Sequence, residues 1–342
     1  MEQSFFEKNK TKYVYIFEDC QLVKGFSRTS ICDLSRKRIF FISNSYYQLT
    51  AYFKKNTIGE IGEMLDDKNS TLQFYKFLSF LLDEQIGILM DDITAFPQIP
   101  VYWDSPSEIT NAIIDIGIKW DFLEKALTEL SQLRCQFLQL RFYKEVNPGT
   151  IEQIVSLVKG KCFKDVEMLL KYSRVKNLHE SLSQLTESQK NIRFLIHSTP
   201  RGSGCLSNAR IRYSEQCITS CGSCGNINPW SLSIPSVQGF MENKLFNSCL
   251  NRKISIDENG RISNCPSMKK KYGNIAEHSL AQVARKKSFK KLWNLNKDII
   301  DTCKDCEFRY ICSDCRAYTE DGTLYGKPAK CSYDPYTASW KS

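Results

Sequence analysis

Residues 303–315 read CKDCEFRYICSDC and space four cysteines as C-x2-C-x5-C-x2-C. Cys249 and Cys265 precede this stretch and Cys331 follows it. A CxxC pair lets two thiolates from one tight turn reach the same metal or cluster, and cysteines from other loops complete four-coordination. Seven cysteines exceed what one four-coordinate site can use, so we expect the C-terminal part of the chain to be organised around metal.

Three kinds of centre compete for these cysteines. Disulfides need an oxidising compartment, and the opening MEQSFFEKNK lacks the features of a signal peptide, so we expect a cytoplasmic protein with reduced thiols. Zinc is an alternative, because paired CxxC motifs are typical of zinc ribbons. However, His278 is the only histidine nearby, and single cysteines far from the pairs suit iron–sulfur clusters with interleaved ligands. We favour iron–sulfur over zinc.

The wider pattern resembles the SPASM domain, the C-terminal extension of peptide-modifying radical SAM proteins that carries auxiliary [4Fe-4S] clusters. The resemblance rests on C-x10-G-x4-C from Cys249 to Cys265, on Tyr272-Gly273-Asn274-Ile275 and on the later cysteines, although the last pair has two intervening residues where three are usual. The amino-acid sequences of residues 249–268, 303–318 and 327–335 resemble the SPASM-domain peptide maturase of grasp-with-spasm systems. That implies two partners, a ribosomally made precursor peptide and an ATP-grasp ligase.

The resemblance also implies which cysteines hold two [4Fe-4S] clusters. One set is Cys303, Cys306, Cys312 and Cys331, and the other is Cys249, Cys265 and Cys315. The second set lacks a ligand, because position 243 is Asn. We take Cys224 as the candidate fourth ligand, with Cys217 and Cys221 as further candidates; an open iron that binds substrate is the alternative.

The first 95 residues predict a small module of strands followed by helices. Expected strands are 13–17, 21–24, 29–33 and 38–42, and expected helices are 46–53, 58–65 and 72–83. This order is typical of a winged helix-turn-helix, which reads either DNA or a peptide. With 12 basic and 13 acidic side chains the module is not basic, so we expect no nucleic-acid partner.

Residues 22–53 also resemble the peptide-recognition element of enzymes that modify ribosomal peptides. Such elements bind a leader peptide as an added strand. The resemblance implies that the leader lies along Arg38, Phe40 and Phe41 and the helix from Leu72. The alternative is a packed N-terminal cap without a ligand.

Strand and helix patterns alternate after the Pro97–Pro100 linker. Expected strands are 109–116, 136–143, 166–172 and 192–197, and expected helices are 122–133, 150–158 and 178–185. This alternation predicts βαβ units on a parallel sheet, resembling a shortened radical SAM partial barrel. The predicted fold class is α/β, or α+β overall, with domains at 1–95, 96–225 and 226–342. No apolar segment reaches membrane-spanning length, so no membrane partner is expected.

Cys217, Cys221 and Cys224 have the C-x3-C-x2-C spacing by which radical SAM enzymes bind their cluster. The motif stands in the wrong place, since it belongs after the first barrel strand, and Ser223 occupies the usual aromatic position. We therefore do not expect S-adenosylmethionine as a cofactor, and an active radical SAM enzyme is the alternative. A DNA-binding metal regulator is a third hypothesis.

Asn259-Gly260 predicts a type I′ hairpin turn between Cys249 and Cys265.

Overall fold

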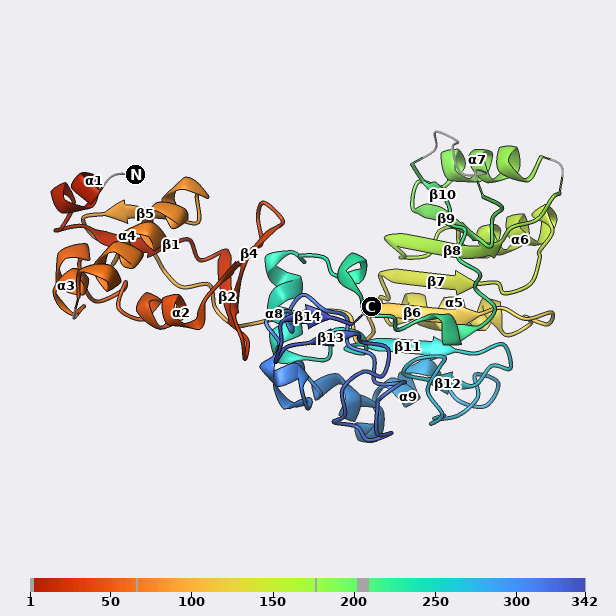
Figure 1. The fold of residues 1–342 in the computed structure, drawn as a ribbon. Coiled ribbons are helices and arrows are strands. Elements are labelled where there is room, and N and C mark those ends of the chain that lie inside the picture. The colour runs from red at the N-terminus through yellow and green to blue at the C-terminus, as the bar shows by residue number, and fades with distance from the viewer. Residues whose placement is uncertain (1–2, 66, 176, 202–208, 342) are drawn as a thin grey trace.

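The computed structural model describes residues 3–65, 67–175, 177–201 and 209–341. A helical N-terminal module and a seven-stranded sheet stand at opposite ends, and the cysteine-rich C-terminal segment lies between them (Figure 1). The chain is therefore a mixed α/β protein, as predicted. In the described ranges no helix is both long and apolar enough to cross a membrane.

The central sheet has the strand order β10-β9-β8-β7-β6-β11-β12, and all neighbours are parallel except β11 and β12. The predicted parallel sheet is confirmed. The sequence did not show that the cysteine-flanked hairpin extends the same sheet, through β11 beside β6. The strands are β6 (Asn111–Asp115), β7 (Phe137–Arg141), β8 (Asp165–Lys171), β9 (Ile192–His197), β10 (Ile211–Tyr213), β11 (Lys253–Ile256) and β12 (Ile262–Ser263).

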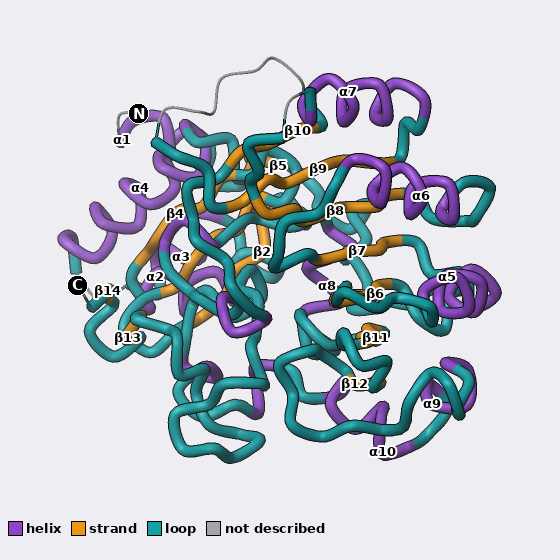
Figure 2. The backbone as a smooth tube through the Cα atoms, turned by 90° about the vertical axis from the view of Figure 1, so that its right-hand side faces the viewer, coloured by secondary structure: helices purple, strands orange, loops and turns teal. Residues whose placement is uncertain are grey.

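Helices α5 (Leu123–Gln132), α6 (Pro148–Val158) and α7 (Leu178–Ser188) run along one side of this sheet (Figure 2). In α5 the apolar residues recur at helical spacing, and the resulting stripe is buried against the sheet. Asn147 caps α6, since its side chain accepts from the N–H of Thr150 at 2.8 Å, and Pro148 occupies the first turn.

The hairpin between β11 and β12 is confirmed, but its predicted turn type is wrong. A type I′ turn needs positive φ at both central residues, and here Gly260 has φ +76° while Asn259 does not. The loop instead turns around Asp257, whose carbonyl accepts from the N–H of Gly260 at 2.8 Å and whose side chain accepts from Asn259 and Arg261. An aspartate that binds the following backbone explains the longer loop.

The N-terminal module has two small sheets. Strands β2 (Cys20–Lys24), β3 (Thr29–Asp33) and β4 (Arg38–Ile42) form one antiparallel sheet, and β1 (Tyr13–Ile16) pairs with β5 (Gly87–Met90), which the sequence did not predict. The helices are α1 (Gln3–Lys8), α2 (Asn44–Thr50), α3 (Ile58–Glu63) and α4 (Lys68–Asp83). Helix α4 begins four residues before the predicted start, because Asp67 caps it.

The β2-β3-β4 sheet is covered on both faces. Ile31 and Ile42 pack on the N-terminal helices, whereas Val23 and Cys32 share a core with the C-terminal segment. Glu307, fully buried, joins the two parts: its carboxylate accepts from Arg28 at 2.6 Å and from the hydroxyl of Tyr333.

The remaining elements are η1 (Cys221–Ser223), η2 (Pro229–Ser231), α8 (Val237–Leu245), α9 (Leu280–Ala284), α10 (Lys287–Lys290), η3 (Lys291–Asn294), η4 (Lys297–Ile299), η5 (Cys303–Asp305), β13 (Tyr333–Asp334) and β14 (Ser339–Trp340).

Leu140→Ala tests the parallel sheet as the main core. Leu140 is fully buried in β7, so the truncation should lower the free energy of unfolding by about 3 kcal/mol, measured by urea denaturation. The matched control is Ile118→Ala, a side chain that is 84% exposed and should change stability by less than about 0.5 kcal/mol. Equal losses in both variants would contradict this packing.

Candidate metal centre

Four cysteines from three segments gather around the β11–β12 hairpin. Cys249 precedes β11 and Cys265 follows β12, so the antiparallel pairing brings them to the same end of the hairpin. Cys224 directly follows η1. A Cβ added to Gly225 would lie 2.9 Å from the Sγ of Cys315, so the backbone after Cys224 runs against Cys315.

Electrostatic interactions link these four thiols. Burial raises the pKa of Cys265 to about 11, and the neighbouring Cys249 and Cys224 add to the rise. Burial also raises the pKa of Cys315, and Cys249 and Cys224 contribute there as well. Since such interactions weaken with distance, Cys224 lies in the neighbourhood of the other three.

Lys253 supplies a positive charge to this group. Its Nζ donates to the Sγ of Cys249 at 3.3 Å. Burial by itself would lower the pKa of Lys253, but attraction to Cys249, Cys265 and Cys224 outweighs burial and raises it. A charged lysine stabilises a thiolate, which is the form of cysteine that binds metal.

The second predicted ligand set is Cys303, Cys306, Cys312 and Cys331, and its members influence one another electrostatically. Burial raises the pKa of Cys303 to about 12 and that of Cys312 to about 11, although the charge of Lys297 opposes both rises. Burial likewise raises the pKa of Cys306, with Cys312 and Cys303 adding to it. Cys331 adds to the rise at Cys312.

Lys297 is only 3% exposed, which is rare for a lysine. Its Nζ donates to the carbonyl of Cys312 at 2.9 Å and to the hydroxyl of Ser248 at 3.2 Å. Close by, Arg316 and Asp314 form a fully buried pair at 2.7 Å. Sequence reasoning missed Lys253, Lys297 and Arg316, because nothing in their neighbours distinguishes them from surface charges.

The donor set fits a thiolate-ligated metal or cluster. Thiols with pKa values of about 11 to 12 are protonated at neutral pH, so metal binding there would release protons. Thiolates are soft ligands that suit iron–sulfur clusters and zinc. Within the described ranges no three His, Cys, Asp or Glu side chains are arranged to hold a single metal ion. The assignment of these eight cysteines to two clusters of four stays a prediction.

Cys217 is exposed and Cys221 is half-buried. Both belong to the segment that follows β10. Strand β10 itself is one edge of the sheet, and the cysteine-flanked hairpin is the other. The Ser267 hydroxyl donates to the carbonyl of Cys221 at 2.9 Å, which ties this segment to the loop after Cys265. The C-x3-C-x2-C motif is thereby connected to the hairpin site rather than to the loop after β6, which contains no cysteine.

The carboxyl ends of β6 and β7 hold a buried ion pair that the sequence analysis did not identify. The Nε of Arg141 donates to Asp115 at 2.7 Å, and the hydroxyl of Tyr143 donates to the same oxygen at 3.1 Å. Burial raises the pKa of Asp115, although Arg141 opposes the rise. Ligands of parallel sheets commonly bind at this edge.

The three residues predicted to bind peptide all make contacts within the chain. The guanidinium of Arg38 pairs with Asp33 at 3.2 Å, and the ring of Phe40 packs against α4. The ring of Phe41 meets that of Phe308 at 5.5 Å between centroids. Along β4 the outer backbone edge is unpaired by any other described strand.

The isolated cysteines outside the two predicted ligand sets are mostly buried thiols. Cys20, Cys32 and Cys135 are 2% exposed or less, and burial raises the pKa of all three, to about 11 or 12. Cys162 differs from them, since its side chain is exposed and donates to the Ser131 carbonyl at 3.3 Å.

Comparison with known proteins agrees with this geometry. Residues 248–307 match the SPASM family, described as an iron–sulfur cluster-binding domain. The match covers the hairpin cysteines and the first CxxC pair, and it ends before Cys312. No curated protein matches the chain. The C-terminal segment thus contains an iron–sulfur cluster-binding domain of the SPASM type.

Proposed function

We propose that this protein is an iron–sulfur maturation factor for ribosomally made peptides, which binds a precursor peptide and acts in the cytoplasm with an ATP-grasp ligase. The observation that carries the proposal is the SPASM match over residues 248–307, in which Cys249 and Cys265 flank a hairpin and interact electrostatically with Cys224. Two [4Fe-4S] clusters are the centres that such donor sets would hold.

Bound clusters would supply electron transfer or an open iron. The chain's own residues would stabilise them by charge, since a four-thiolate cluster carries a net negative charge and needs compensation where water is excluded. Lys253 and Lys297 stand in the two groups and provide it. The surplus of 22 basic over 13 acidic side chains after residue 199 acts in the same direction.

Cysteine substitutions test the two-cluster assignment. Cys249→Ser and Cys312→Ser should each lower iron and labile sulfide in anaerobically purified protein by about half, because each removes a ligand of a different cluster. Cys162→Ser is the matched control and should leave both contents unchanged. A protein that contains zinc and no labile sulfide would disprove the iron–sulfur assignment.

The alternative is a self-sufficient radical SAM enzyme that uses Cys217, Cys221 and Cys224. The C-x3-C-x2-C spacing of these cysteines favours this alternative. The hydrogen bond from Ser267, in the loop after Cys265, to the carbonyl of Cys221 favours an auxiliary role for them. We expect dithionite-reduced protein with intact clusters to form no 5′-deoxyadenosine from S-adenosylmethionine, as measured by chromatography. Formation of 5′-deoxyadenosine that disappears in Cys217→Ser would instead favour the radical SAM enzyme over the maturation factor.

Peptide maturation is tested by expressing a candidate ribosomally made precursor peptide and an ATP-grasp ligase, with or without this chain. We expect the modified precursor mass to require the chain. Cys312→Ser should abolish the modification, since it removes a cluster ligand, while Cys162→Ser should retain it. Identical mass spectra with and without the chain would contradict the proposed function.

A further inference from the structure

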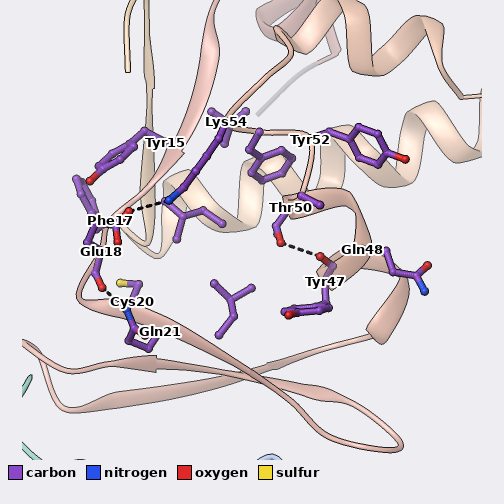
Figure 3. A pocket seen from close by; sticks show the side chains of 15 residues that line it. Tyr15, Phe17, Glu18, Cys20, Gln21, Tyr47, Gln48, Thr50, Tyr52 and Lys54 are labelled. Atoms are coloured by element: carbon purple, nitrogen blue, oxygen red, sulfur yellow. Dashed lines mark hydrogen bonds and ion pairs between the residues drawn. The ribbon is translucent and has the colours of Figure 1, made fainter. Parts of the chain in front are cut away.

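A cavity of about 690 Å³ lies in the N-terminal module between β1, β2 and α2. Figure 3 shows Tyr47 and Thr50 on its α2 side and Cys20 and Gln21 on its β2 side. This volume is in the range of ligand-binding pockets. None of the elements predicted to bind peptide, β4 and α4, contributes to the residues that line it.

Residues of β2, the outer strand of its sheet, form one wall of this cavity. At the ends of this outer edge the N–H of Cys20 already donates to Phe17 at 2.9 Å and the carbonyl of Lys24 already accepts from Arg309 at 2.6 Å, so Leu22 is the central position that can pair. The N–H of Leu34 donates to Asp19 and that of Gly25 donates to Arg28, both at 2.9 Å, so odd-numbered residues of β2 bond to β3. Antiparallel pairs alternate between bonded and non-bonded. The N–H and C=O of Leu22 therefore point away from β3, and Leu22 is one of the residues that line the cavity.

A second wall is the open edge of β1. The N–H of Phe17 donates to Ile86 at 3.0 Å, which marks the bonded side of the β1–β5 pair. By the same alternation Val14 and Ile16 direct their backbone groups away from β5, and both line the cavity. Residues of two outer strands thus line one cavity.

We infer that this cavity binds the precursor as an added strand along β2, so that the peptide docks on the opposite edge of the sheet from β4. The inference rests on the proposed peptide-binding function and deepens it. An extended backbone is the ligand that matches a strand edge, because it offers alternating donors and acceptors. A wholly apolar ligand would leave the groups of Leu22 unpaired.

The walls also indicate which side chains the peptide carries. Leu22, Tyr47 and Phe53 line the cavity, and successive side chains of a strand alternate in direction, so every second residue of the peptide should be apolar. At the rim, Lys54 pairs with Glu18 at 3.0 Å, and its side chain is 51% exposed. An ammonium has three donors, so Lys54 can also meet an acidic residue flanking the apolar positions.

Proline substitution distinguishes the two edges, because proline removes one outward N–H and is tolerated on an edge strand. Leu22→Pro alters β2, and Phe41→Pro alters the equivalent outward position of β4. Binding of the fluorescently labelled precursor peptide to the full-length protein is measured by anisotropy. We expect Leu22→Pro to weaken binding at least tenfold and Phe41→Pro to change it less than twofold.

Hydrogen exchange of the unmodified protein gives a second readout that does not depend on how the variants fold. Bound precursor should slow exchange of the Leu22 amide and leave the Phe41 amide unchanged. Protection of Phe41 with no change at Leu22 would overturn this inference while retaining peptide binding. Absence of any precursor binding to the unmodified protein would overturn the proposed function and this inference together.

Discussion

The parallel pairing of β11 with β6 is the contact on which the rest of the structure depends. A hairpin of two short strands is marginal alone, but here it is the end of a seven-stranded sheet with a fully buried core. The loops before β11 and after β12 carry Cys249 and Cys265, so a rigid sheet positions two candidate ligands. Both η1 and the Cys315 loop then have a fixed surface to pack against.

Buried positive charge is the second constraint. Lys297 is 3% exposed and Lys253 is half-buried, and each stands beside a cysteine. A cation away from water is costly unless a negative partner compensates it. Protonated thiols compensate poorly, whereas a thiolate-ligated cluster would compensate well. The buried carboxylate of Asp314 already compensates the charge of Lys297 in part. An anionic centre on the cysteines, which the SPASM match favours, would add to this compensation and would also serve Lys253.

Local patterns predicted most elements, and long-range pairing escaped prediction. Alternating apolar residues located β6 to β9 and β2 to β4, because periodicity reflects burial. No local sequence pattern could reveal that β11 pairs with a strand about 140 residues earlier. Nor could it reveal that hydrogen bonds to Asp257 organise a longer loop where a type I′ turn was expected. The cysteine spacing predicted the ligand candidates, while the lysines beside them look like ordinary surface residues in the sequence.

The N-terminal sheet and the metal centre are physically connected. Cys306 and Cys331 pack against the core that contains Val23 and Cys32, and Glu307, next to Cys306, binds Arg28. A cluster on Cys306 would order the very segment that covers one face of β2 and β3. The strand edge proposed to receive the peptide belongs to this same sheet, and Cys306 and Cys331 pack against one of its faces. If these cysteines hold a cluster, its loss would loosen the packing on that face.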